Sequence, residues 1–297
     1  MTNKIAVLLL FALISGCTPE KQEDTRTDVP QDFRLITYNV WYGFTKTPER
    51  KPQWIEWMQH QAPDVVSLQE LNEYTPAQLA EDAALWGHPY TELLKEDGFP
   101  TGVTSKYPIE DIHRLREGFQ HGLLRVKIEG MYFYIIHLHH GNWEVRNREI
   151  DLILADIQAL PADARVILAG DFNTFSPDDS VYYAHGRLED FFMEREIAFD
   201  EPNLYEGKLD YNVVQKLTDH GFVDLEVSMR PTDYTFTGTY PTLIEKEGEH
   251  GDLRRLDYVF VNPAVVDQVK RAQIVANDTT LMVSDHLPVV VDFSFQQ

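Results

Sequence analysis

Three side chains near the end of this sequence could activate water for attack on another group. Asp285 and His286 are adjacent just before an apolar segment, and Asp257 opens an earlier one. A carboxylate on one ring nitrogen of a histidine fixes its tautomer and makes the other nitrogen more basic. Such a histidine can take a proton from water or balance charge at phosphorus. On its own, the Asp285-His286 pair would be interpreted as a loop acid beside a surface histidine. The presence of Asp257 as a second acid for His286 favours a catalytic role.

A second candidate motif follows the apolar segment 165–169. Asp171 and Asn173 are one residue apart, so in extended backbone their side chains would point the same way. The carboxylate can accept a proton or hold a metal, and the amide can contact a phosphate oxygen without adding negative charge. A structural turn is the alternative, because Gly-Asp and Asn-Thr are common in turns.

Two polar residues end predicted strands and could bind a cation. Glu70 ends the segment 65–70, and Asn39 follows Ile36-Thr37-Tyr38. A carboxylate is a hard oxygen ligand suited to Mg²⁺ or Mn²⁺. Each residue could equally be a solvated strand end.

Histidines gather at a further strand end. His137 and His139 alternate, so they would share one face of a strand with His140 opposite. No acid-rich or Cys-rich motif accompanies them, which disfavours zinc. We expect one of these histidines to contact phosphate and the others to be packed or solvated.

Regular elements must bring these residues together. Helices are expected at 52–61, 76–86 and 144–160, and loops with short helices at 178–220. Alternation of strands and helices early in the chain, followed mostly by strands, favours two packed sheets with outer helices. The expected strands cover residues 33–40, 65–70, 103–105, 122–128, 131–138, 165–169, 222–225, 234–237, 256–261, 271–275 and 288–293.

Composition limits the classes of function. The chain has 297 residues, 43% of them hydrophobic, which is enough for one large domain or two small ones. Its net charge of −22 argues against broad, non-specific binding to nucleic-acid backbones. A nuclease stays possible, because bound metal cations can supply positive charge locally.

The amino terminus predicts export. Lys4 precedes an apolar run at 5–14, too short to span a membrane, and Ile14-Ser15-Gly16-Cys17 resembles a bacterial lipobox. We therefore expect a signal peptide at 1–16, lipid attachment at Cys17, a polar tether at 17–31 and a single domain at 32–297. A plain signal peptide or an uncleaved anchor are the alternatives. The expected location is a bacterial membrane, at the outer membrane or the periplasmic face.

With these motifs assembled, the chain resembles the endonuclease/exonuclease/phosphatase superfamily, which includes deoxyribonuclease I, abasic-site endonucleases, neutral sphingomyelinases and inositol polyphosphate phosphatases. The resemblance runs from about Phe33 to Phe295. It rests on motifs that occur in the family's order: Thr37-Tyr38-Asn39-Val40, residues 63–70, residues 104–109, Ile136-His137-Leu138, Arg146 with Glu149, residues 170–173, residues 255–258 and residues 284–288.

The resemblance implies a four-layer α/β/β/α sandwich of two packed mixed sheets flanked by helices. It also implies that Glu70 binds a catalytic Mg²⁺, with Asn39 beside it and Asp285 contributing.

The same resemblance assigns the catalytic roles. Asp171 and His286 would activate water, with Asp257 orienting His286, and the choice of base between Asp171 and His286 stays open. Asn173 and His137 would contact the phosphate.

The sequence departs from the family pattern at two places, and the second of them changes the expected activity. Ile135-Ile136 replaces the usual Asn-Thr before His137, and Trp41 stands where some abasic-site enzymes carry an acid. The second departure makes DNA repair less plausible, as does export.

The sequence thus predicts a monomeric, Mg²⁺-dependent phosphodiesterase or phosphatase that acts on small or lipid-like phosphoesters, with Mn²⁺ as a possible substitute metal. An exported metal-dependent nuclease is the first alternative. A non-catalytic binding lipoprotein on the same fold is the second.

Overall fold

Two six-stranded sheets form the centre of the molecule. The computed structural model describes residues 32–246 and 249–295, so the predicted signal peptide at 1–16 and the tether with Cys17 lie outside the described residues. The first sheet has the order β13-β14-β1-β2-β4-β3 and the second β11-β12-β8-β7-β6-β5. Their bounds are Val269–Ile274, Val289–Ser294, Asp32–Asn39, Val65–Gln69, Gly102–Ser105 and Tyr90–Leu93, then Val223–Asp224, Asp257–Val261, Arg165–Asp171, Met131–His137, Leu123–Ile128 and Glu110–Leu115.

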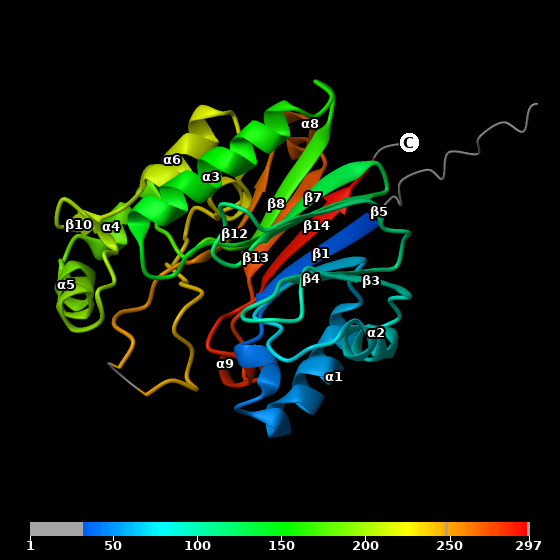
Figure 1. Ribbon diagram of the computed structural model, residues 1–297, viewed down its shortest axis with the longest axis horizontal. Helices are drawn as coiled ribbons and strands as arrows, with labels where there is room; N and C mark the ends of the chain where they lie inside the picture. Colours follow the sequence, from blue (N-terminus) through cyan, green and yellow to red (C-terminus); the bar gives the residue numbers. More distant parts are fainter. Residues whose placement is uncertain (1–31, 247–248, 296–297) are drawn as a thin grey trace, which may run out of the picture.

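Helices cover both outer faces and complete the predicted four-layer sandwich (Figure 1). Helices α1 (Lys51–Gln61) and α2 (Pro76–Leu85) pack on the first sheet, and α3 (Trp143–Gln158) and α6 (Asn212–Asp219) on the second. Each helix buries one apolar side, as residues three and four apart share a face. Across the described part of the chain, no helix has the length and apolar character needed to cross a membrane.

The main core lies between the sheets, where inward residues of both meet, including Leu35, Val65, Phe133 and Val291. In each sheet the central pair of strands is parallel, β1 with β2 and β7 with β8, and the other pairs are antiparallel. The carboxyl ends of the four parallel strands therefore open toward one end of the sandwich.

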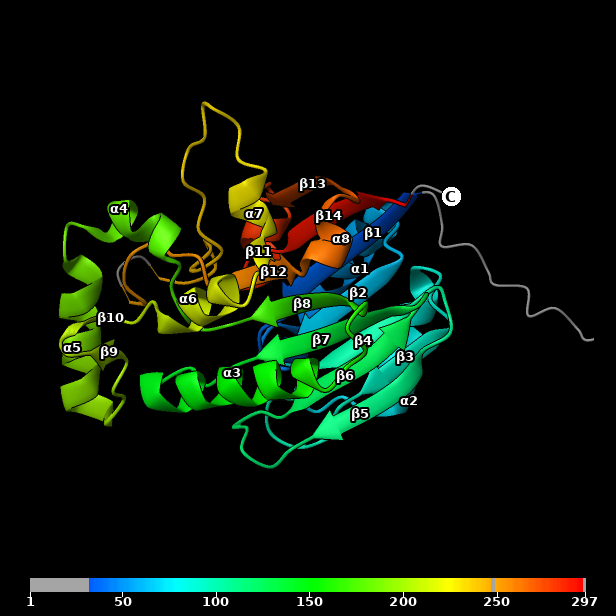
Figure 2. The same cartoon turned by 90° about the horizontal axis from the view of Figure 1, so that it is seen from above.

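A smaller unit extends from that end of the sandwich (Figure 2). It holds α4 (Ser180–Tyr183), α5 (Arg187–Phe199) and a short hairpin of β9 (Leu204–Tyr205) with β10 (Lys208–Leu209). Its own apolar cluster contains Phe175, Tyr183, Leu188, Phe192 and Leu256. The remaining short helices are α7 (Leu225–Ser228), α8 (Pro263–Val266) and α9 (Thr280–Val283), with single 3-10 turns at Tyr42–Phe44, Pro48–Arg50 and Pro177–Asp179.

Three details of the sequence-based assignment are wrong. Residues 234–237 form no strand, because Phe236 stacks on Tyr182 at 4.4 Å and Thr237 bonds locally to the Tyr234 hydroxyl. Residues 187–199 form a continuous thirteen-residue helix, α5, instead of only short helices. Strands β3 and β5 were not predicted; both are short sheet edges, and β5 is mostly exposed and charged.

Candidate active site

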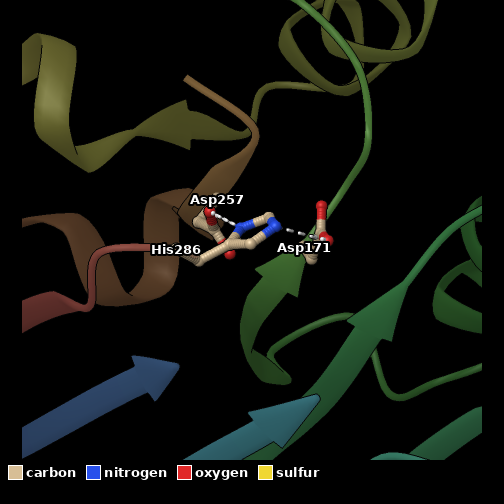
Figure 3. A group of neighbouring side chains, drawn as sticks. All are labelled: Asp171, Asp257 and His286. Atoms are coloured by element: carbon tan, nitrogen blue, oxygen red, sulfur yellow. Dashed lines mark hydrogen bonds and ion pairs between the residues drawn. The ribbon is translucent and has the colours of Figure 1, made fainter. Parts of the chain in front are cut away.

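Sheet register places the predicted histidine and its acids together (Figure 3). Asp257 pairs with Asp171 across β12 and β8, and His286 precedes β14. The His286 Nδ1 atom lies 2.7 Å from Asp257 Oδ2, and its Nε2 atom lies 3.8 Å from Asp171 Oδ2. All three side chains are buried. The imidazole is thus held between two carboxylates that come from the facing sheet.

The protonation of this trio follows from burial and charge. Burial lowers the pKa of His286, but the carboxylates of Asp257, Asp171 and Asp285 outweigh it and raise the pKa to about 10. Burial raises the pKa of Asp171 to about 7, against the opposing effect of His286. A protonated imidazole therefore faces a carboxylate that is far more basic than an ordinary aspartate.

The backbone around Asp171 is built for close approach. Gly170 pairs with Ile136 of β7, and a Cβ atom at position 170 would lie 2.0 Å from the Ile136 carbonyl oxygen. The next strand residue, Asp171, pairs with His137, whose Nε2 atom lies 3.8 Å from Asp171 Oδ2. Only glycine at position 170 lets the two strands deliver Asp171 and His137 to the same spot.

Asn39 connects this trio with Glu70. Its Nδ2 atom donates to Glu70 Oε1 at 3.2 Å and to Asp171 Oδ2 at 3.1 Å, while its Oδ1 atom accepts from the Trp41 amide. The second Glu70 oxygen accepts from the Tyr42 amide at 3.0 Å. As oriented, Asn39 presents its amino group to the carboxylates, so it bridges them and offers no free oxygen.

Glu70 and Asp285 have the chemistry of a divalent-cation site. Burial raises the pKa of Asp285 to about 8, His286 opposes this, and the negative charge of Glu70 adds to it. Among the described residues, Asp285 accepts only one side-chain hydrogen bond, from Ser284 Oγ at 3.3 Å. Two neighbouring, poorly neutralised carboxylates are hard oxygen donors that fit Mg²⁺ or Mn²⁺.

Backbone strain marks the same region. Glu70 has a φ of 58°, and Trp41, Tyr42 and Asn173 have φ values of 49°, 53° and 49°. Non-glycine residues rarely adopt this left-handed conformation, and it concentrates at functional sites.

Within the described residues, the one tight group of metal-capable side chains is Asp171, Asp257 and His286, whose ligand atoms lie within 4.8 Å of one another. A hydrogen bond already joins His286 to Asp257, and a proton occupies it. This group is therefore better suited to proton transfer, and Glu70 with Asp285 is the better cation site.

Asn173 lines the site, but its backbone conformation differs from the predicted one. Strand β8 ends at Asp171, and the Asn173 amide then donates to Asp171 Oδ1 at 2.9 Å in a tight turn. The expected extended backbone is wrong here. Asn173 still lines the cavity, but its Nδ2 atom donates to the Leu138 carbonyl at 3.0 Å.

The prediction that His137 and His139 share a face is also wrong. Strand β7 ends at His137, and the chain then turns, so that His137 and His140 line the cavity and His139 does not. The buried Glu149 carboxylate fixes this turn by accepting from the amides of His139 and Gln120.

Sequence reasoning missed His121. Its ring stacks on His137 with centroids 4.1 Å apart and planes 11° apart. Both side chains are buried, and both line the cavity. No spacing pattern marks His121, because the contact joins a bend to the end of strand β7, sixteen positions further along the chain.

Most of these side chains, though not those of Asn39 and Asp257, line one cavity of about 330 Å³. Its catalytic end carries Glu70, Asp171, Asp285 and His286. Its other end is formed by the smaller unit and by residues 240–246 and 249–256, with the side chains of Phe191, Phe192, Arg195, Glu201, Tyr240, Glu245, His250 and Arg254. Sequence reasoning missed this second end entirely.

A sandwich of this topology with carboxylates and histidines at one end is the arrangement that the sequence motifs predicted. A family model described as the Endonuclease/Exonuclease/phosphatase family matches residues 36–286. The chain therefore belongs to the endonuclease/exonuclease/phosphatase family, as its motifs predicted, and the family supports a phosphoester hydrolase.

Solved structures share the fold at low identity. An AP endonuclease from Archaeoglobus fulgidus has a TM-score of 0.64 at 18% identity, covering 88% of this chain and 99% of its own. The 3′ phosphatase NExo from Neisseria, bound to a product DNA hairpin, has a TM-score of 0.64 at 16% identity, covering 89% of this chain and 100% of its own. D. rerio TDP2, complexed with a single-strand DNA product, has a TM-score of 0.60 at 17% identity, covering 90% of this chain and 100% of its own. No curated protein matches this sequence.

Proposed function

We propose that this protein is a Mg²⁺-dependent hydrolase of small or lipid-like phosphate esters, with Mn²⁺ as a possible substitute. The observation that carries the proposal is the buried His286 held between Asp257 and Asp171 at the mouth of a cavity that also contains Glu70 and Asp285. The net charge of −22 disfavours a nucleic-acid substrate that must be gripped along its backbone.

The chain's own residues supply the proton transfers and the orientation. Asp171 accepts a proton from the attacking water, because burial has made its carboxylate basic. His286, kept cationic by Asp257, offsets the negative charge that develops on the phosphoryl oxygens. His137 is neutral and buried, and can donate one hydrogen bond to a phosphoryl oxygen. When bound by Glu70 and Asp285, Mg²⁺ would stabilise charge on the phosphate and the leaving oxygen.

Hydrolysis of bis-p-nitrophenyl phosphate in Mg²⁺ tests the proposal. We expect His286→Ala and Asp171→Asn each to lose at least ~10²-fold in kcat/KM, as expected for removal of an acid–base group. Asp163→Asn is the matched control, because this aspartate is exposed and precedes β8. Equal activity in wild type and both site variants would refute the assignment. The absence of any hydrolysis, with folded protein and Mg²⁺, would favour a non-catalytic binding protein on this fold.

A nuclease is the second candidate, favoured by the DNA products in two of the similar structures. It predicts plasmid nicking in Mg²⁺ that stops with EDTA. Intact plasmid across Mg²⁺, Mn²⁺ and Ca²⁺ would remove this candidate.

We also propose that the protein is a monomer, exported and anchored to a bacterial membrane through lipid on Cys17. The short basic start, the apolar run and the small residues before Cys17 support the anchor. In a bacterial host, the wild-type chain should incorporate a labelled fatty acid and Cys17→Ser should not. Equal labelling of the two chains would contradict lipid attachment at Cys17.

A further inference from the structure

Arg254 is a buried cation at the far end of the cavity. It is 5% exposed and lies next to Arg255, which is fully buried. Arg255 is neutralised by Asp179, at 2.7 Å, and by Asp224, also at 2.7 Å. For Arg254, by contrast, no carboxylate of residues 32–246 and 249–295 lies within 4 Å. A buried charge without a counter-ion is costly, so this arrangement requires an explanation.

The polar atoms of Arg254 are only partly satisfied. Its Nη1 atom donates to the carbonyl oxygens of His250 and Asp252, at 2.7 Å and 3.0 Å. Its Nε atom is buried and has no partner among the described residues. Carbonyl contacts hold the guanidinium in place, but no carboxylate of the described residues balances its positive charge.

Aromatic rings and a backbone bridge fix the direction of this side chain. The guanidinium carbon lies 4.6 Å from the ring centre of Tyr240, 5.4 Å from that of Phe192 and 5.6 Å from that of Phe191. The Arg254 amide donates to the Tyr240 carbonyl at 2.7 Å. A preorganised cation of this kind loses little entropy when it binds an anion.

Tyr240 connects this cation with the catalytic end. Its ring centre lies 4.8 Å from that of His286 and 4.6 Å from the Arg254 guanidinium carbon. The two cationic groups are therefore separated by one aromatic side chain along the same cavity. A ligand with one phosphate at His286 could place a second anionic group at Arg254, with its carbon skeleton against the rings.

The other basic side chains at this end of the described cavity wall already contact acids. Arg195 contacts Glu201 at 2.7 Å, and His250 contacts Glu245 at 2.9 Å. Arg254 is thus the one arginine of the described cavity wall that is available to a ligand anion.

We propose that Arg254, with Phe191, Phe192 and Tyr240, forms an anion subsite that selects small organic phosphoesters carrying a second phosphate group. The proposal deepens the proposed function and rests on it for the identity of the reacting phosphate. Arg254 is a specificity residue in this scheme, and the chemistry stays with the groups around His286.

Calorimetric titration with inorganic pyrophosphate in EDTA tests the subsite without catalysis. In the absence of metal, the acidic catalytic end repels the probe, so binding depends on Arg254. We expect Arg254→Gln to weaken binding at least ~10-fold, since a charge-assisted contact is lost. Arg254→Lys should be intermediate, because lysine keeps the charge and loses the guanidinium fork. Arg195→Gln, a paired arginine on the same wall, should change the affinity less than ~2-fold.

Competition during hydrolysis of bis-p-nitrophenyl phosphate tests the choice of ligand. In Mg²⁺, 1,3-propanediol bisphosphate should inhibit wild type at least ~10-fold more strongly than the monophosphate, and this ratio should approach one in Arg254→Gln. Circular dichroism establishes that each variant is folded.

Either of two calorimetric results would overturn the subsite: wild type that does not bind pyrophosphate in EDTA, or folded Arg254→Gln that binds it as wild type does. The competition assay could also overturn it. If oligonucleotides were the only inhibitors whose potency depends on Arg254, the site would bind a polynucleotide. If no variant hydrolyses any ester, the proposed function fails, and the calorimetric result still decides the subsite.

Discussion

His286 and Asp257, two buried side chains, are joined by one hydrogen bond of 2.7 Å between Nδ1 and Oδ2. The other Asp257 oxygen is buried without a partner among the described residues, so this carboxylate is committed to the histidine. It fixes the imidazole tautomer and holds Nε2 toward Asp171.

We therefore expect Asp257→Asn to lower kcat/KM for bis-p-nitrophenyl phosphate by at least ~10²-fold, because an amide cannot stabilise the imidazolium. Asp267→Asn is the control, since Asp267 is exposed, follows β12 and lies outside the site. Steady-state kinetics on both variants measures the difference. Wild-type kinetics in Asp257→Asn would show that His286 needs no orienting partner.

The parallel stack of His121 on His137 leads to a second prediction. Burial lowers the pKa of His121 to about 3 and that of His137 well below its ordinary value. Both rings are therefore neutral at pH 7 and can pack face to face without charge repulsion. The stack holds His137 at the carboxyl end of β7 beside Asp171.

His121→Ala should lower kcat/KM about 10-fold by freeing the His137 ring, as positioning errors of this kind do. His121→Phe keeps a flat ring at the same place and should retain most of the activity. Paired kinetic measurements separate these effects. If phenylalanine is as damaging as alanine, the His121 nitrogen atoms matter more than the stack.

Much of this arrangement could be predicted from local sequence. The strands that end at Asn39, Gln69, His137 and Asp171 have strong apolar patterns, and central parallel strands deliver their carboxyl ends to one edge. The motif order was enough to indicate the sandwich and the residues at its end. The strand positions follow from hydrophobic periodicity, which a single sequence shows directly, whereas the four-layer sandwich and the site roles were implied by the resemblance of the motifs to the family.

The other half of the cavity could not be predicted, because it depends on contacts between irregular segments. Arg254 is positioned by carbonyls at 250 and 252 and by rings on α5, and nothing in its immediate sequence distinguishes it from Arg255. The 234–237 segment has strand-forming residues, yet it forms no strand. Phe236 stacks on Tyr182, and this tertiary contact outweighs the segment's intrinsic preference.

Removal of a divalent metal provides a third prediction. Glu70 and Asp285 repel each other when no cation lies between them, and Glu70 is in a strained backbone conformation. In EDTA, Glu70→Gln should be at least as thermally stable as wild type, because one of the repelling charges is gone. Wild type should gain about 2.7 kcal/mol at a Mg²⁺ concentration of 100 Kd, and Glu70→Gln should gain much less.

Thermal unfolding with and without Mg²⁺ measures this difference, and Glu73→Gln is the control. Glu73 is an exposed residue three positions further along the chain, so its variant should respond to Mg²⁺ as wild type does. An equal Mg²⁺ response in Glu70→Gln would move the cation site away from Glu70.

The last prediction concerns stability against acid and a residue remote from the active site. His88 is buried; its Nδ1 atom lies 2.7 Å from Thr104 Oγ1 and its Nε2 atom 2.8 Å from the Pro63 carbonyl oxygen. Burial lowers its pKa to about 4, with a smaller contribution from Lys106, while Asp64 and the hydrogen bonds oppose the shift.

Between pH 6.5 and about 4, the unfolded chain therefore binds a proton at His88 that the folded chain excludes. Stability must fall as the pH drops through this window, with a contribution from His88 of up to about 3 kcal/mol. His88→Gln keeps hydrogen-bonding groups without an ionisable ring, so its urea unfolding free energy should depend less on pH there. His60→Gln, on the exposed side of α1, is the control. Parallel pH profiles for wild type and His88→Gln would mean that His88 is protonated in the folded protein.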